Sequence, residues 1–101
     1  MSKEFYNLAK KTFEEIFNYV EENYQDFDID YDQDNLVIEI NELTFILSIH
    51  SPSSQIWLSS PVSGAHHFNL KTQDEKISWI STRDESINLL EKLNKELTSL
   101  K

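Results

Sequence analysis

Acidic side chains are the candidate functional groups that this sequence concentrates most. Residues 21–34 contain seven acidic side chains and no basic one. Hard cations prefer oxygen ligands, and a group of negative charges also raises the local cation concentration. The candidate metal-binding residues are glutamates of a helix-like segment and the alternate aspartates that follow it: Glu14, Glu15, Glu21, Glu22, Asp26, Asp28, Asp30 and Asp32.

The spacing of these acids predicts a weak and exposed site. The aspartates of residues 26–32 alternate with apolar residues, which is typical of a half-buried strand whose carboxylates point outward, about 6.5–7 Å apart. Neighbouring carboxylates can share an ion, but four at this spacing cannot surround one at about 2–2.6 Å, even with Glu21 and Glu22 above them. We expect weak, poorly selective binding of Fe²⁺, Fe³⁺ or other divalent cations. The alternative is a solvated acidic surface that serves only solubility.

An EF-hand is excluded, although residues 28–39 match its loop in part. Glu39 stands at the twelfth place, but Gln33 occupies the sixth, where the sharp turn requires glycine. The residues that follow have strand periodicity in place of the exiting helix.

A tryptophan in a strand-like segment is the second candidate functional residue. If Ile56 and Leu58 face the core, Trp57 faces the opposite side of the sheet. An exposed tryptophan is a large, rigid anchor for a protein interface. Half coverage of this side chain by neighbouring strands is the alternative. The residues whose parity places them on this face as partner contacts are Gln55, Trp57, Ser59, His67 and Asn69.

The remaining aromatic and imidazole side chains are weaker candidates for a function. His66 and His67 are adjacent in a strand and point to opposite faces, so a surface contact by His67 is favoured over a joint metal site. His50 is assigned no role, and no Ser–His–acid arrangement is evident. Trp79 shares parity with Ile77 and is predicted to lie in the core.

Helical periodicity at both ends and strand periodicity between them predict an α+β fold. Residues 4–24 form a helix with Ser2 as its N-cap, and residues 84–100 form a second, with a capping box at Thr82–Glu85. The second apolar stripe is Ile87, Leu90, Leu93, Leu97 and Leu100. The six strands are expected at 26–32, 36–40, 43–49, 55–59, 66–70 and 77–81. We expect a two-layer α-β sandwich, with the N- and C-terminal helices on one face of a single antiparallel sheet of about six strands.

Composition limits the classes of partner. The 101 residues carry a net charge of −9, with 12 acids and three bases in residues 1–50. This field repels nucleic acid and anionic membranes and attracts cations or a basic protein surface. The chain has no cysteine, which excludes disulfides, thiolate metal ligands and cysteine nucleophiles. With no apolar run near 20 residues and no signal core, we expect a bacterial cytoplasmic protein, or a mitochondrial matrix protein if this is a processed eukaryotic form.

One long segment resembles the signature of the frataxin family, including its bacterial CyaY-like members. It runs from Gln55 to Phe68 and reads QIWLSSPVSGAHHF. Shorter matches extend the resemblance over roughly residues 4–97: Glu4-Phe5 with Leu8-Ala9, Glu21-Glu22 followed by Asp26, Asp28, Ile29 and Asp30, and Trp79-Ile80. Tyr6, His50 and His67 depart from residues that relatives carry at the corresponding places.

The resemblance implies one frataxin-like domain over residues 1–101 and a function in iron–sulfur cluster assembly. We expect an iron-binding regulator or adaptor, not an enzyme, that docks through Trp57 on the cysteine desulfurase and the scaffold protein. Activation and inhibition of that machinery both remain open. We expect a monomer, or an oligomer formed with iron. The alternative is a weak ferroxidase or iron-storage protein that oxidises Fe²⁺ on the acidic residues and oligomerises; an acidic interaction module indifferent to metal is a third hypothesis.

Overall fold

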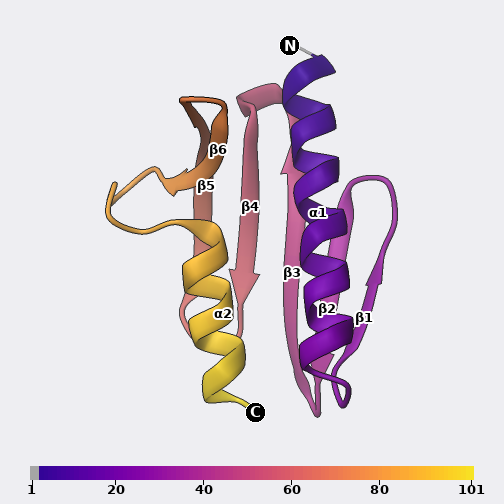
Figure 1. Ribbon diagram of the computed structural model, residues 1–101. Coiled ribbons are helices and arrows are strands. Elements are labelled where there is room, and N and C mark those ends of the chain that lie inside the picture. The colour runs from indigo at the N-terminus through magenta and orange to yellow at the C-terminus, as the bar shows by residue number, and fades with distance from the viewer. Residues whose placement is uncertain (1–2) are drawn as a thin grey trace.

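The chain passes from one helix through six strands to a second helix (Figure 1). The computed structural model describes residues 3–101, so the predicted N-cap Ser2 lies outside the described residues. In chain order the elements are α1 (Lys3–Asn23), β1 (Asp28–Tyr31), β2 (Asn35–Ile40), β3 (Leu43–His50), the 3-10 helix η1 (Ser51–Ser53), β4 (Gln55–Ser60), β5 (Gly64–Gln73), β6 (Lys76–Ser81) and α2 (Leu89–Ser99).

The six strands form one antiparallel sheet in which each strand pairs with its neighbour in the chain. Tight turns allow this order: Asn41 takes a positive φ of 57° between β2 and β3, and Gly64 takes 91° where β5 begins. Both α-helices lie on the same face of the sheet, and within residues 3–101 no α-helix covers the other face (Figure 1). The predicted two-layer α-β sandwich is therefore confirmed.

The apolar stripes of both helices meet the helix-facing side of the sheet in one hydrophobic core. Trp79 belongs to this core, as predicted, with 2% of its surface exposed. Its indole N–H donates to Thr12 Oγ1 at 2.9 Å, and the edge of its ring meets Phe5 at a centroid distance of 5.8 Å. Within residues 3–101, no helix is long and apolar enough to cross a membrane.

The first strand is shorter than predicted. Strand β1 covers only Asp28–Tyr31, because a turn interrupts the alternation at each end. Before it, the N–H of Phe27 donates to the carbonyl of Tyr24; after it, the N–H of Asp32 donates to the carbonyl of Asn35. The prediction of four evenly spaced strand aspartates was therefore wrong, since Asp26 and Asp32 lie outside β1.

The second helix begins later than predicted. The side chain of Asp84 accepts from the N–H of Ser86 at 3.0 Å and closes a turn before the helix. Asn88 is the N-cap, and its side chain accepts from the N–H of Glu91 at 2.9 Å. The predicted capping box at Thr82–Glu85 was wrong. Leu90, predicted in the apolar stripe, is 48% exposed, because the register of α2 turns it away from the core.

Candidate docking face and acidic edge

The sheet face without helices brings the five predicted partner-contact residues together. In the β4–β5 register, Gln55 lies opposite Asn69 and Trp57 lies opposite His67. Ser59 is two residues from Trp57 on the same strand, so it shares this face. Their neighbours Ile56 and Leu58 are buried on the helix side.

Trp57 lies between two histidine rings. His67 stacks on one face of the indole at a centroid distance of 4.3 Å, and His50 stacks on the indole at 3.7 Å. The interplanar angles are 11° and 16°. The expected exposed tryptophan is therefore half-buried. His50, to which the sequence assigned no role, ends β3 one residue beyond the predicted strand 43–49 and pairs with Gln55 of β4, a register that the sequence pattern did not reveal.

Hydrogen bonds hold this stack in place. The indole N–H donates to Gln55 Oε1 at 2.8 Å, and Gln55 Nε2 donates to Asn69 Oδ1 at 3.0 Å. Ser53 bonds His50 Nδ1 at 2.6 Å and donates to Gln55 Oε1 at 3.1 Å. Because these side chains are already ordered, the face loses little conformational entropy when a partner binds. We call His50, Trp57 and His67, with Gln55 and Asn69, the docking face.

Two predicted metal ligands lie on the same face of the sheet, at its β1 edge. Ile29 and Tyr31 pair with buried β2 residues, so Asp28 and Asp30 point away from the helices. The register places Glu39 directly opposite Asp28. Side chains in such a pair have Cβ atoms about 4.5–5.5 Å apart, which makes this the best placed pair of strand carboxylates. Glu39 was not among the predicted ligands, although its alternation with Ile38 and Ile40 indicated an outward carboxylate.

The other two predicted aspartates lie in turns. Asp32 Oδ1 accepts from the N–H of Asn35 at 3.2 Å and so stabilises the β1–β2 turn. Lys10 Nζ donates to the carbonyl of Asp32 at 3.0 Å, which ties this turn to α1. Asp26 is exposed in the turn between α1 and β1. The two carboxylates therefore do not continue the row of Asp28 and Asp30.

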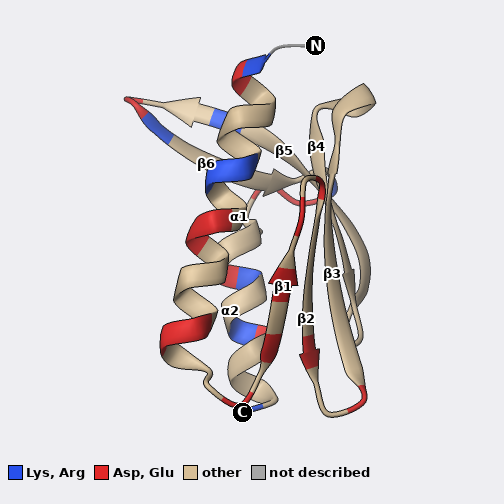
Figure 2. Cartoon of the chain, turned by 90° about the vertical axis from the view of Figure 1, so that its right-hand side faces the viewer, with Lys and Arg blue, Asp and Glu red and all other residues tan. Residues whose placement is uncertain are grey.

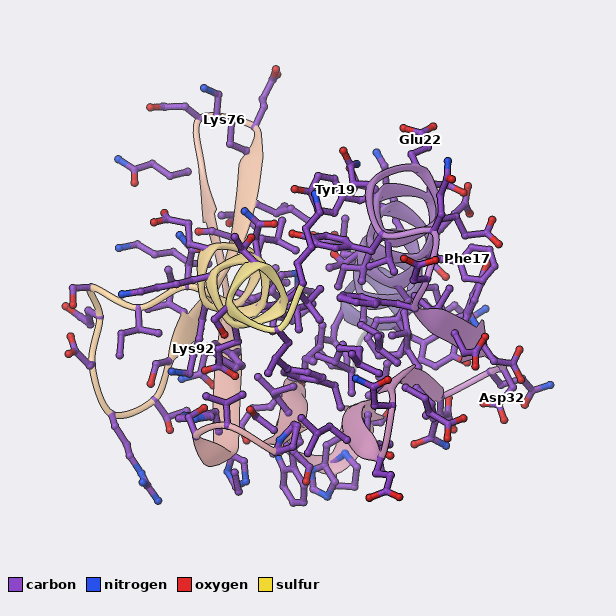
Figure 3. The ribbon with its side chains drawn as sticks, turned by 90° about the horizontal axis from the view of Figure 1, so that it is seen from below. Phe17, Tyr19, Glu22, Asp32, Lys76 and Lys92 are labelled. Atoms are coloured by element: carbon purple, nitrogen blue, oxygen red, sulfur yellow. The ribbon has the colours of Figure 1, made fainter. Side chains whose placement is uncertain are left out.

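The four helix glutamates are exposed but divide between two flanks of α1. Phe17 packs on Tyr31 at a centroid distance of 5.1 Å, which identifies the flank that faces β1. Glu14 and Glu21 are three and four residues from Phe17 and share this flank. Glu15 instead lines a groove between α1 and α2. Figure 3 shows Glu22 projecting away from the sheet, while Asp32 lies beyond the β1 edge.

The structure therefore spreads the eight predicted ligands over the β1 edge, the turns beside it and the far flank of α1, and does not gather them into one site. Figure 2 shows acidic positions of α1, β1 and β2 on the side of the molecule that carries β1. Among residues 3–101, no three His, Asp or Glu side chains converge to hold a metal ion. The carboxylates suit a hydrated hard cation held by one or two of them, such as the Asp28–Glu39 pair. We call Asp28, Asp30, Glu39, Glu14 and Glu21 the acidic edge.

A separate cluster of polar groups connects α2 to the β4–β5 turn. Glu96, only 6% exposed, accepts from the hydroxyls of Ser60 at 2.5 Å and Ser63 at 2.7 Å, and Lys92 Nζ lies 3.2 Å from it. His66 Nε2 is 2.9 Å from Ser63 Oγ. A nucleophilic serine must give its proton to histidine, but Ser63 gives its proton to Glu96, so the cluster is not a catalytic triad.

The cluster shifts two ionisation equilibria. Burial works to raise the pKa of Glu96, but hydrogen bonds from Ser60, Ser63 and Lys92, with the charge of Lys92, outweigh it and lower the pKa. Burial, followed by the charge of Lys92, lowers the pKa of His66, and the nearby Glu96 only partly opposes this. At neutral pH the cluster therefore pairs an ionised Glu96 with a neutral His66.

Two helices on one face of a six-stranded antiparallel meander, with the other face uncovered, define a two-layer α-β protein of the frataxin-like class. The model of the frataxin-like domain matches residues 1–100. The chain belongs to the frataxin family.

Curated relatives come from eukaryotes and bacteria. The chain is 49% identical over 70 residues to a mitochondrial frataxin-like protein of Leishmania donovani. This alignment covers 64% of this chain and 36% of the relative. It is 35% identical to mitochondrial frataxin of Arabidopsis thaliana, across 97% of this chain and 54% of the relative. The iron-sulfur cluster assembly protein CyaY of Neisseria meningitidis serogroup C is 31% identical, with 95% of this chain and 85% of the relative covered.

The eukaryotic relatives are longer, and this chain spans only about a third to a half of their length. Among solved structures, frataxin from Psychromonas ingrahamii, of the CyaY family, superposes with a TM-score of 0.81. The two are 25% identical, and the match covers 95% of this chain and 87% of the other.

Proposed function

We propose that this protein regulates iron–sulfur cluster assembly by docking on the cysteine desulfurase–scaffold complex and by binding Fe²⁺ or Fe³⁺ weakly. Membership of the frataxin family supports this, as does the CyaY relative that is named an iron-sulfur cluster assembly protein. Because this chain has no cysteine, it has no thiolates for a nascent cluster and acts on a complex that supplies them.

The observation that carries the proposal is that the docking face and part of the acidic edge share one sheet face. Trp57 lies on β4, and Asp28 and Glu39 lie on β1 and β2, with β3 between them. A partner that covers this face contacts the stack and meets the carboxylates in the same interface. A cation held by Asp28 and Glu39 reduces the negative charge that the partner meets, so iron modulates docking.

The stack also supports binding over catalysis. The indole of Trp57 is stacked on both imidazole rings and fixed by a hydrogen bond to Gln55, which suits a rigid interface patch. The acids are exposed on a surface, where water fills the remaining coordination positions of a bound ion. This arrangement favours reversible, weak iron binding over a fixed redox centre.

The test is desulfurase turnover with the scaffold protein present, with and without Fe²⁺. We expect Trp57→Ala to abolish most of the effect of this protein on the rate. Val62→Ser, which removes a 51% exposed apolar side chain from the turn between β4 and β5, is the control and retains the effect. An unchanged effect in Trp57→Ala would contradict docking through this face.

The iron-binding part of the proposed function is tested separately by anaerobic titration of ¹⁵N-labelled protein with Fe²⁺, with Ca²⁺ as the reference cation. We expect loss of amide signals around Asp28, Asp30 and Glu39. No perturbation at millimolar Fe²⁺ would remove the iron function and leave docking. Oxygen consumption stoichiometric with Fe²⁺, and lost in an Asp28→Asn/Asp30→Asn double variant, would instead support the ferroxidase alternative.

A further inference from the structure

Two of the three histidines of the chain lie on the docking face, one on each side of Trp57. His50 comes from β3 and His67 from β5, so the strands on both sides of β4 each contribute an imidazole ring. Both histidines are half-buried, and their ring planes lie within 16° of the indole plane. Because histidine is the side chain that ordinarily changes its charge between about pH 5 and 8, the charge at the centre of this face depends on pH.

The hydrogen bonds around His50 determine which of its ring nitrogens carries a proton in the neutral form. His50 Nδ1 lies 2.6 Å from Ser53 Oγ. Ser53 has one hydroxyl proton, which it donates to Gln55 Oε1 at 3.1 Å, so the Nδ1–H of His50 is the donor to Ser53. A second proton then adds at Nε2 and breaks none of these hydrogen bonds. Protonation of His50 therefore changes the charge of the stack without requiring the stack to rearrange.

The side chains beside the stack on this face are uncharged. The pairing register places Gln55 opposite His50 and Asn69 opposite Gln55, and the 3-10 helix η1 that follows His50 contains only serine and proline. The other neutral residues on this face, on β2 to β6 and directly after β6, are Asn35, Ser48, Ser59, Ala65, Ile80 and Thr82. Within residues 3–101, the register therefore pairs neither imidazole with a carboxylate that could neutralise its positive charge.

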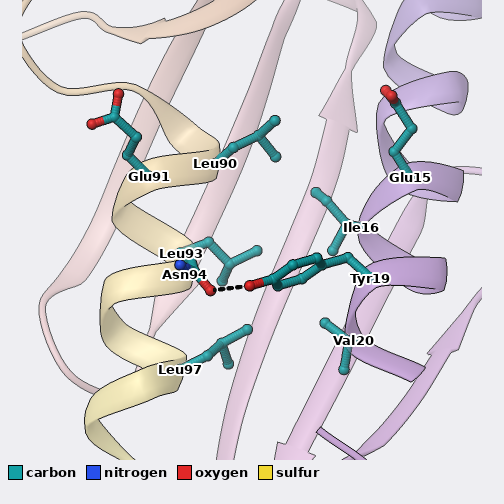
Figure 4. Close-up of a pocket in the computed structure, with 9 residues that line it drawn as sticks. All are labelled: Glu15, Ile16, Tyr19, Val20, Leu90, Glu91, Leu93, Asn94 and Leu97. Carbon is teal, nitrogen blue, oxygen red and sulfur yellow. Dashed lines mark hydrogen bonds between the residues drawn. The ribbon is translucent and has the colours of Figure 1, made fainter. Parts of the chain in front are cut away.

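Neutral residues separate the charged side chains of this side of the sheet from the stack. Lys71 and Lys76 share the face toward the β5–β6 hairpin, and Arg83 lies in the loop after β6. The acidic edge lies on β1 and β2, with β3 between it and Trp57. The helices pack on the opposite layer, where Glu15 and Glu91 line the groove between α1 and α2 (Figure 4). An imidazolium in the stack is therefore held by ring contacts and hydrogen bonds and not by an ion pair.

We propose that docking on the partner complex requires His50 and His67 to be neutral, so that the interface weakens as the pH falls through the range in which histidine gains its charge. This inference rests on the proposed function and adds a regulation of the same surface. An imidazolium covered by a partner loses its water and finds no carboxylate of this chain, which makes its burial unfavourable. The net charge of −9 favours a basic partner surface, which repels both added charges.

The size of the effect follows from the exclusion of protons on binding. Two ordinary imidazoles that must both lose their charge before binding lower the affinity by about tenfold between pH 8 and pH 6. The affinity for the desulfurase–scaffold complex, measured by calorimetry at both pH values, gives this ratio for the wild type. Far-UV circular dichroism at both pH values checks that the protein stays folded.

The double variant His50→Gln/His67→Gln isolates the two histidines. Glutamine is uncharged at both pH values, so the ratio of the two affinities should fall to the part that the partner contributes, even where docking itself is weaker. His66→Gln removes the third histidine, which faces the helix layer, and should keep the wild-type ratio. Equal ratios in the wild type and the double variant, with docking intact, would overturn this inference and leave the proposed function standing. No docking of the wild type at pH 8 would contradict both.

The free protein gives a second test that needs no partner. In an NMR titration from pH 8 to pH 6, the ring signals of His50 and His67 should show the gain of a positive charge. Nuclear Overhauser contacts between both imidazoles and the indole of Trp57 should persist, because protonation leaves the hydrogen bonds of the stack in place. Imidazoles that stay neutral at pH 6, or a stack that separates when they are charged, would overturn the inference even where docking through Trp57 is confirmed.

Discussion

The indole ring of Trp57 and the imidazole ring of His67 lie nearly parallel, 4.3 Å apart between centroids, on adjacent strands. His50 stacks on the same indole, which creates a three-ring layer on an uncovered sheet face. Stacked rings restrain one another, so a partner meets an ordered group of side chains and not a single mobile one. The two histidines therefore belong to the proposed docking surface and are not merely its neighbours.

Removal of either stacked imidazole should weaken docking while leaving the fold intact. We expect His50→Ala or His67→Ala to lower the free energy of unfolding by about 1 kcal/mol or less, the scale of one aromatic pair. Affinity for the desulfurase–scaffold complex, measured by calorimetry, should fall several-fold because Trp57 loses its fixed orientation. His66→Ala is the matched control, since this residue points to the other face. An equal loss of affinity in that variant would refute a specific function of the stack.

Replacement of the buried carboxylate should destabilise the protein in a pH-dependent way. Glu96→Gln removes a charge that accepts from Ser60 and Ser63 and pairs with Lys92, so we expect a loss of about 1–3 kcal/mol at pH 7. Urea unfolding of both forms from pH 7 to pH 3 measures it.

The pH dependence follows from the sign of the shift. The pKa of Glu96 is lower in the folded protein than in the unfolded chain, so the ionised group stabilises the fold above the ordinary glutamate pKa of about 4.3. This contribution is lost as the pH falls through the lower folded-state value. The difference in the free energy of unfolding between wild type and Glu96→Gln should therefore decrease as the pH falls over that range. A constant difference would contradict the assigned ionisation, and exposed Glu42→Gln serves as the reference variant.

The carboxylates of the acidic edge should lower the stability of the fold and favour cation binding. Asp28 and Glu39 are directly opposite, and like charges in such pairs repel. Asp28→Asn should therefore raise the free energy of unfolding by about 0.5 kcal/mol or less, and the gain should diminish as salt screens the repulsion. The same variant should weaken Co²⁺ or Fe²⁺ binding several-fold in an NMR titration. Loss of stability together with unchanged cation affinity would show that this pair is not a cation site.

A buried hydrogen bond between helix and sheet offers a sharper stability test. Trp79 donates its indole N–H to Thr12 Oγ1 at 2.9 Å, and Thr12 donates to the carbonyl of Leu8 at 2.8 Å. Thr12→Val keeps the shape and leaves the buried N–H without an acceptor, so we expect a loss of about 1–3 kcal/mol. Thr12→Ser keeps the hydroxyl and should lower the free energy of unfolding by a smaller amount. Equal thermal midpoints for the two variants would contradict this reading of the bond.

Local periodicity was sufficient for the parts of the fold that depend on near neighbours. The alternation of Ile56 and Leu58 placed Trp57 on the open face, and the parity of Trp79 placed it in the core. Alternation and turn residues gave the number of strands, and the common side of the two helices followed from the need to cover apolar faces.

The features that were missed depend on register between distant segments. The position of Glu39 opposite Asp28, and of His50 beside Trp57, follows from strand pairing, which no single segment specifies. The ends of β1 were also missed, because the Phe27 N–H bonds the carbonyl of Tyr24 and turns the chain before the strand begins. Alternation of residue types alone does not reveal such a bond.

The start of the second helix gives the last test, because two segments compete as its cap. The sequence pattern favoured Thr82–Glu85, whereas the side chain of Asn88 accepts the N–H of Glu91 and its own amide donates to the Glu91 carboxylate at 2.6 Å. We expect Asn88→Ala to lower the free energy of unfolding by about 1 kcal/mol, the usual loss for an N-cap. Thr82→Ala should change it by about 0.5 kcal/mol or less, because Thr82 is exposed and precedes the helix by several residues. Chemical denaturation of both variants measures this, and a larger loss for Thr82→Ala would mean that the helix begins earlier in solution.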